Sequence, residues 1–134
     1  MQSRETRVFS RRYTVGPEHV AKHIEADGIR VLSTPSLVGF IEETCRIFWD
    51  QVLPEGYTTV GVRVDVHHLK PAALGSELEV RAAALHADEK RALFWVEVWS
   101  GKLFIGYALH ERAIVEKAAF AARVKSMISS SAGG

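Results

Sequence analysis

The chain has 134 residues, of which 47% are hydrophobic and 25% are charged; these values are typical of a single globular domain and exclude the disordered and fibrous classes. Its formal net charge of +1 gives no overall attraction to nucleic acid, so we expect no nucleic-acid partner and only a few placed groups for any anionic ligand. The single cysteine excludes an internal disulfide and is typical of the reducing cytoplasm, where we expect the protein to reside.

The N-terminal part predicts a short strand followed by a loop region. Residues 1–12 are polar and basic without an apolar run, so we expect no signal peptide. A strand is predicted from about Arg7 to Val15, and Gly16-Pro17 ends it. Residues 18–24 suit one or two helical turns, and residues 26–28 (Ala-Asp-Gly) are a loop signal. No segment approaches the roughly 20 apolar residues that span a bilayer, so we expect no membrane partner.

A long helix is predicted next in the chain. Thr34 followed by Pro35 places a hydroxyl at the N-cap and proline at the first helical position. Apolar side chains then recur at helical spacing, and residues 54–56 (Pro-Glu-Gly) are expected to end the helix. The apolar positions are Leu37, Ile41, Thr44 or Cys45, Phe48 and Val52; the polar face carries Gly39, Glu43, Arg46 and Asp50.

The rest of the chain is rich in β-branched and aromatic residues and predicts four more strands. Two of the breaks between them are short enough for hairpins, so those strands should pair antiparallel. A short helix is expected from Ala118 to Ile128, and residues 1–6 and 129–134 are expected to be flexible ends of one domain spanning 1–134. Together these elements predict an α+β domain in which an antiparallel sheet covers the long helix. The predicted strands are Tyr57 to Leu69, Glu77 to His86, Ala92 to Ser100 and Leu103 to Val115.

Two adjacent glutamates of the predicted helix lie on different faces. Glu42 projects from the mostly apolar stripe, whereas Glu43 shares the polar face. An ionised carboxylate in apolar surroundings costs several kcal/mol unless it is paired or hydrogen-bonded. Glu42 is therefore our candidate functional carboxylate; the alternative is a glutamate at the edge of the stripe that reaches solvent or holds a neighbouring strand.

Two adjacent histidines at the end of the first predicted long strand differ in the same way. His68 falls in phase with the valines at 60, 62, 64 and 66 and should face the helix, while Gly61 and His67 should face the other side. An inward histidine opposite an inward carboxylate would form an acid/base pair that works near neutral pH. We therefore expect Glu42 and His68 to meet in a shared cavity, with a satisfied core histidine as the alternative.

Other side chains give weaker signals. Thr34 is explained by capping alone, but a residue at a helix start also lies beside free backbone N–H groups that can hold a developing oxyanion. His19 and His23 stand one helical turn apart without a third ligand, so no metal site is predicted. His110-Glu111-Arg112 lacks the second histidine of a zinc motif.

Three segments together resemble the fluoroacetyl-CoA thioesterase family and its hot-dog relatives. They are residues 31–45 (VLSTPSLVGFIEETC), 61–75 (GVRVDVHHLKPAALG) and 110–113 (HERA). A threonine precedes a glutamate by eight residues, a glycine precedes a histidine by seven, and an HER triplet lies in the last strand. The resemblance spans roughly Arg12 to Lys125.

The resemblance implies a hot-dog fold, in which an antiparallel sheet of about five strands wraps around a long central helix. It further implies a homodimer that shares its active sites and a thioesterase that releases a free acid and CoA, with no cofactor besides the CoA of the substrate. By the same resemblance Thr34, Glu42 and His68 are catalytic, and Gly61 and Arg112 contact the substrate.

One departure from the family bears on the substrate. Fluoroacetate specialists carry aromatic residues just before the threonine, whereas residues 25–32 contain none and Gly28 stands where a phenylalanine is expected. We therefore expect a different small or medium acyl group. The alternatives for the chain are hydration of an enoyl-CoA on the same scaffold and acyl-CoA binding without turnover.

Overall fold

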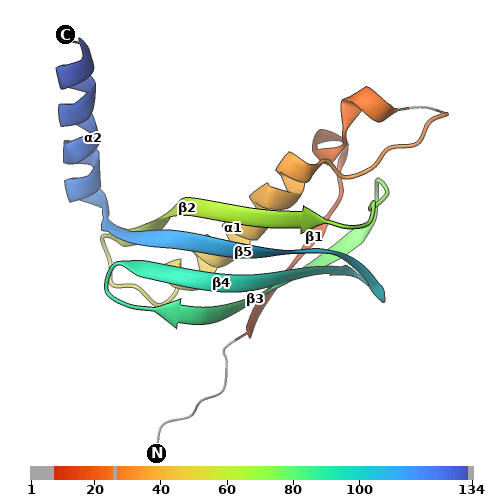
Figure 1. The fold of residues 1–134 in the computed structure, drawn as a ribbon, viewed down its shortest axis with the longest axis horizontal. Coiled ribbons are helices and arrows are strands. Elements are labelled where there is room, and N and C mark those ends of the chain that lie inside the picture. Colours follow the sequence, from red (N-terminus) through yellow and green to blue (C-terminus); the bar gives the residue numbers. More distant parts are fainter. Residues whose placement is uncertain (1–7, 26, 133–134) are drawn as a thin grey trace, which may run out of the picture.

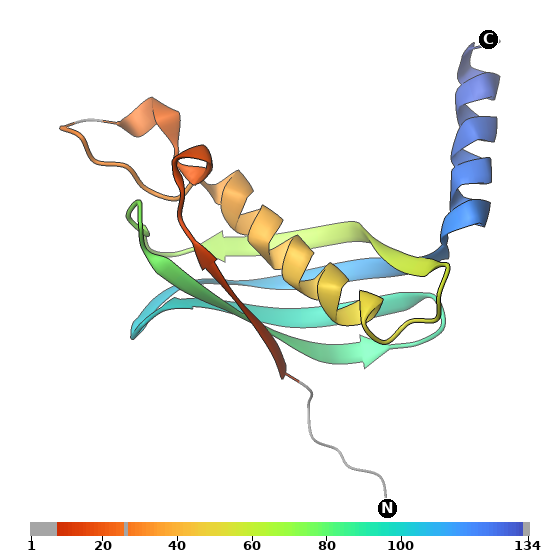
Figure 2. The same ribbon diagram turned by 180° about the vertical axis from the view of Figure 1, so that it is seen from behind.

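Five antiparallel strands form one sheet in the order β1-β3-β4-β5-β2, and helix α1 lies across one face of it (Figures 1 and 2). The structure is a computed structural model that describes residues 8–25 and 27–132. Two short 3₁₀ helices, η1 and η2, stand before α1, and a second helix, α2, follows β5. The elements are β1 Val8–Thr14, η1 Pro17–His19, η2 Lys22–Ile24, α1 Thr34–Asp50, β2 Tyr57–His68, β3 Glu77–Ala87, β4 Arg91–Ser100, β5 Leu103–Glu116 and α2 Lys117–Ala132.

The long helix and the strands confirm the predicted α+β architecture, and both predicted hairpins pair antiparallel. Most strand bounds agree with the prediction within one or two residues, because alternating apolar side chains mark each strand directly. The last helix is longer than predicted and includes residues 129–132, which we expected in a flexible tail. Glu116 caps this helix by accepting a hydrogen bond from the Ala119 N–H at 2.7 Å. The other expected flexible residues, 1–6 and 133–134, lie outside the described residues.

The start and end of α1 differ from the prediction. The N-cap is Ser33, whose Oγ accepts a hydrogen bond from the Ser36 N–H at 3.2 Å, so Thr34 is the first helical residue and not the cap. The prediction was wrong because both hydroxyl residues suit a cap and only the backbone geometry selects one. The helix also ends at Asp50, before the predicted Pro54-Glu55-Gly56 break, and Val52 is 51% exposed instead of packed in the apolar stripe.

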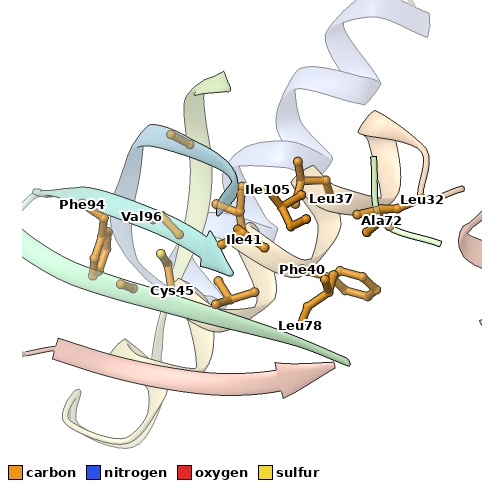
Figure 3. Close-up of a cluster of buried hydrophobic side chains, with 14 of the residues drawn as sticks. Leu32, Leu37, Phe40, Ile41, Cys45, Ala72, Leu78, Phe94, Val96 and Ile105 are labelled. Atoms are coloured by element: carbon orange, nitrogen blue, oxygen red, sulfur yellow. The ribbon is translucent and has the colours of Figure 1, made fainter. Parts of the chain in front are cut away.

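The core fills the space between α1 and the concave face of the sheet (Figure 3). Leu37, Ile41 and Cys45 project from one side of α1 and are fully buried, as the helical spacing predicts. Burial raises the pKa of the Cys45 thiol to about 12, which keeps it protonated and unreactive. Cys45 is therefore a packing residue. The same core cluster includes the strand residues Leu78, Phe94, Val96 and Ile105.

A β-bulge in strand β2 changes which side chains face α1. The pairing register between β2 and β5 shifts between Gly61 and Arg63. One extra residue inverts the alternation of side chains on its N-terminal side. As a result Val62 is 47% exposed, whereas Thr59 is buried at 3% exposure. The prediction that all four valines share the inner face holds for Val64 and Val66, which pack against the core, and is wrong for Val60 and Val62. Gly61 faces the helix instead of solvent.

Both edges of the sheet are open within the chain. Among residues 8–25 and 27–132, the 12 residues of β2 pair only with β5, and the 7 residues of β1 pair only with β3. Helix α2 makes few contacts with the body and extends beyond the β2 edge in both views (Figures 1 and 2). No helix in the described part of the chain is long and apolar enough to cross a membrane.

Candidate active site

A hydrogen-bonded pair joins the start of α1 to the end of β2. Thr34 Oγ1 lies 2.8 Å from His68 Nδ1. The capping role falls to Ser33, so the Thr34 hydroxyl is free to make this contact. The distance is that of a hydroxyl nucleophile and its general base. Sequence reasoning selected both residues, and the structure brings them together.

The protonation of His68 follows from its surroundings. Its side chain is half-buried, and burial lowers the pKa of the imidazole, an effect that the backbone of Lys70 partly opposes. The imidazole is therefore neutral at pH 7. Its Nε2 atom is buried and forms no hydrogen bond with the described residues. In the tautomer that places the proton on Nε2, Nδ1 is free to accept the Thr34 hydroxyl proton.

The Thr34–His68 pair lines a cavity of about 650 Å³ at the N-terminal end of α1. A volume of this size suits a small-molecule ligand. The wall is mainly apolar, with Lys22, His23 and Lys70 as its polar side chains besides Ser33 and the Thr34–His68 pair. Its apolar side chains include Val20, Ile24, Val31, Leu32 and Leu69. We call this space the α1 cavity.

Glu42 lies elsewhere, between α1 and the first half of β2. Its side chain is 43% exposed, and Oε2 stands 3.6 Å from Arg112 Nη1. A Cβ at position 61 would collide with this carboxylate oxygen, so the glycine makes room for it. Glu43 is exposed, as the helical spacing predicts. Glu42 and Arg112 line a second hollow of about 570 Å³, which also includes Ser36.

Arg112 is held in place by groups that sequence reasoning did not single out. Its Nε and Nη2 donate to Thr59 Oγ1 and Thr59 O at 2.7 and 2.9 Å. His110 accepts from Arg112 Nη1 at 3.1 Å through Nε2, while its Nδ1 donates to the Arg63 carbonyl at 2.9 Å. Burial lowers the pKa of His110, so the imidazole is neutral and suited to accept from a guanidinium. Three hydrogen bonds thus orient the guanidinium toward Glu42, and the Arg63 carbonyl fixes His110, which accepts one of them.

The sequence contains one indirect signal for this cluster. His110 and Arg112 stand two residues apart, so they project from the same face of a strand, and that face is the buried one. Thr59 could not be found in this way, because the bulge reverses its orientation.

Within one chain the three predicted catalytic residues form two separate groups. Thr34 and Glu42 are eight residues apart on α1, which places their Cα atoms about 12 Å apart. Gly61, beside Glu42, and His68 are seven residues apart on β2, roughly 20 Å along the strand. The expected shared cavity for Glu42 and His68 is thus not formed by a single chain: His68 lines the α1 cavity and Glu42 the other hollow.

His19 contacts groups of its own chain at the start of η1. His19 Nδ1 accepts a hydrogen bond from the Gly16 N–H at 2.9 Å, and its ring packs edge-on against Phe40. Across residues 8–25 and 27–132 no three His, Cys, Asp or Glu side chains are grouped so as to hold a metal ion.

Comparison with known proteins identifies the relatives of this chain. The model of the family described as fluoroacetyl-CoA-specific thioesterase, FlK, matches residues 15–118. The solved structure of the fluoroacetyl-CoA thioesterase FlK has a TM-score of 0.82 at 24% identity and covers 94% of this chain and 98% of its own. A Thermus thermophilus protein of the thioesterase superfamily gives 0.85 at 23% identity, covering 97% and 96%. A hot-dog-like protein from Thermanaerovibrio acidaminovorans gives 0.82 at 22% identity, covering 91% and 90%. No curated protein matches the sequence.

These findings confirm the hot-dog fold, and the family match favours hydrolysis over hydration or binding without turnover. The matched segment contains every element from η1 to β5 and both groups of site residues. The chain belongs to the fluoroacetyl-CoA-specific thioesterase family and is a thioester hydrolase.

Proposed function

We propose that the protein hydrolyses a small or medium acyl-CoA other than fluoroacetyl-CoA, in a site formed by two subunits. Thr34 and His68 of one subunit supply the nucleophile and its base, and Glu42 of the partner subunit completes the site. The 2.8 Å hydrogen bond between Thr34 Oγ1 and His68 Nδ1, at the wall of an apolar cavity, is the observation that carries the proposal.

The shape of the sheet supports the dimer. Strand β2 is a long edge strand with one row of backbone groups left open, and such an edge is a template for pairing with another chain. A two-fold axis through the middle of β2 would place the first half of this strand beside the second half of its copy. Glu42 lies beside Gly61 in the first half, and His68 ends the second half. The symmetry therefore brings Glu42 of one subunit toward His68 of the partner subunit.

The chemistry follows from these positions. The Thr34 hydroxyl attacks the thioester carbonyl, its proton passes to His68 Nδ1, and the C–S bond breaks as CoA leaves with that proton. Water then attacks the Thr34 ester while the Glu42 carboxylate takes one of its protons; the bond between the acyl carbon and Thr34 Oγ1 breaks, the acid leaves, and that proton returns to Thr34 Oγ1. Direct attack of water, activated by Glu42 and His68, is the alternative route. The short contact to Thr34 favours the covalent one.

The identity of the acyl group is inferred from the cavity. A point mutant of FlK has been solved with fluoroacetate and CoA, and the FlK family model covers the present site. Here the segment before Thr34 contains no aromatic residue, and Gly28 has a φ of +74°, a conformation that glycine adopts without strain. Without an aromatic lid the α1 cavity has room for a longer chain than a fluoroacetyl group.

Subunit complementation tests the shared site directly. A His68→Ala subunit is co-expressed with a Glu42→Gln subunit, and mixed dimers are purified through two different tags. One of the two sites then retains every wild-type group, so thiol release from acyl-CoA should recover to about half of the wild-type rate, while each variant homodimer is inactive. Mixed dimers as inactive as both homodimers would show that the three residues work within one chain.

The pH dependence of turnover should report the neutral state of His68. Burial lowers the pKa of this imidazole from 6.5, and a general base acts only when it is neutral. We expect kcat/KM, which reports the groups of the free enzyme, to decline on the acid side with a midpoint below 6.5, as His68 becomes protonated at its lowered pKa. An acidic limb centred at or above 6.5 would contradict this assignment.

Gly61→Ala should lower activity without unfolding the protein. The new methyl group would displace the Glu42 carboxylate, which sits at the end of a flexible side chain and has room to move. Displacement of a catalytic group by about 1 Å costs on the order of 100-fold in rate. Steady-state thiol release and Tm measure the two effects. The matched control is Gly39→Ala on α1, which lines the same hollow as Glu42 but where a Cβ meets nothing within 4 Å and so displaces no group.

A further inference from the structure

Helix α2 carries a short row of apolar side chains whose C-terminal members are left uncovered by its own subunit. Val124 is half-buried, but Met127 is 62% exposed and Ile128 63% exposed. With Phe120 these side chains recur at the spacing of one helical face. Within the described residues, α2 contacts the sheet through its N-terminal turns. There Phe120 and Arg123 line a small hollow beside β4 and β5. An exposed apolar stripe on a solitary helix needs a partner for its stability.

The direction of α2 indicates which partner covers it. Tyr57, the first residue of β2, pairs with Glu116, the residue before α2, so the helix leaves the sheet at the beginning of the β2 edge. From there it extends past that edge, at the end of the molecule opposite η1 and η2 (Figures 1 and 2). A subunit that pairs through β2 would lie on this side of the sheet. Its strand would run in the opposite direction, so its η2 segment and α1 cavity would stand at the α2 end.

The dimensions agree with this placement. The 16 residues of α2 extend about 24 Å, and neighbouring strands lie about 4.8 Å apart. The helix is therefore long enough to cross β2 and reach over several strands of a second subunit. The α1 cavity also has an apolar rim to receive it: Ile24 is 49% exposed and Leu69 54% exposed.

We propose that α2 of each subunit packs its apolar stripe against the partner's η2 segment and forms an outer wall of the partner's α1 cavity. Met127 and Ile128 would then contact the acyl chain and set the accepted length, in the place where this chain lacks an aromatic lid. The proposal rests on the β2-paired dimer of the proposed function and adds α2 as a specificity element.

A cysteine pair tests the placement. Ile24→Cys combined with Met127→Cys should form a disulfide between subunits on mild oxidation, seen as a covalent dimer on a non-reducing gel. Ile24→Cys combined with Ala122→Cys, on the opposite face of α2, should not. The native Cys45 is fully buried and does not interfere. Equal cross-linking of both pairs, or of neither, in a protein that is dimeric in solution would refute the placement of α2.

Substrate preference gives an independent readout. Met127→Asp/Ile128→Asp should lower kcat/KM for octanoyl-CoA about tenfold relative to acetyl-CoA, since apolar contacts to a substrate chain have effects of this size. The control Ala122→Asp/Ser126→Asp adds the same charge on the other face and should leave this ratio unchanged. An unchanged ratio in the first variant, with subunit complementation still successful, refutes the role of α2 alone. Failed complementation in a wild-type α2 background refutes the shared site instead.

Discussion

Glu42→Gln is expected to lower kcat by about 10³-fold while Tm stays within a degree of the wild-type value. Glutamine has the same shape and can keep its carbonyl oxygen facing Arg112, but it cannot take a proton from water. Loss of a general base typically costs 10²- to 10⁴-fold. The side chain is 43% exposed and packs beside Gly61, so the amide is accommodated without a steric penalty. Thiol release from acyl-CoA and thermal unfolding measure both quantities.

The matched control is Glu43→Gln, one residue along the same helix. Glu43 is exposed and lies at the edge of the same hollow, but the ion pair with Arg112 is made by Glu42, so replacing Glu43 removes the same charge and leaves that pair in place. We expect activity within twofold of wild type. Near-normal hydrolysis by Glu42→Gln would remove this carboxylate from the mechanism, and equal losses in both variants would indicate an effect of net charge.

Arg112→Met is expected to lower the free energy of unfolding by about 2–4 kcal/mol, because it removes a buried hydrogen-bond donor and one partner of an ion pair. The guanidinium side chain is 5% exposed and donates to Thr59 and His110 in addition to its ion pair with Glu42. Methionine fills a similar volume but leaves buried acceptors without donors. Urea unfolding followed at one fixed protein concentration measures the change, because dimer formation makes stability depend on concentration.

Arg91→Met is the matched control for this loss. Arg91 pairs with Glu111 at 2.8 Å on the neighbouring strand, but its side chain is 51% exposed. Solvent screening limits such a pair to roughly 0–1 kcal/mol. Comparable losses for the two arginines would show that the buried contacts of Arg112 contribute little beyond its charge.

Several features of this protein were determined by local sequence pattern. Apolar residues at helical spacing marked α1 and separated Glu42 from the exposed Glu43, because the angle between successive helical residues is fixed. Alternation in β2 placed His68 inward and His67 outward in the same way, and the strand does keep a regular alternation from Val64 onward. The short polar breaks marked both hairpins.

Other features were decided only by tertiary structure. Whether Ser33 or Thr34 caps α1 depends on backbone dihedrals that both residue types allow, and the choice of Ser33 is what frees the Thr34 hydroxyl for His68. The bulge at Gly61 arises from the pairing of β2 with β5, strands far apart in the chain, and it turns Thr59 inward to hold Arg112. Local periodicity fixes the direction of a side chain from its own element alone. Which side chains meet depends on register and packing between distant segments, and those are set by the fold as a whole.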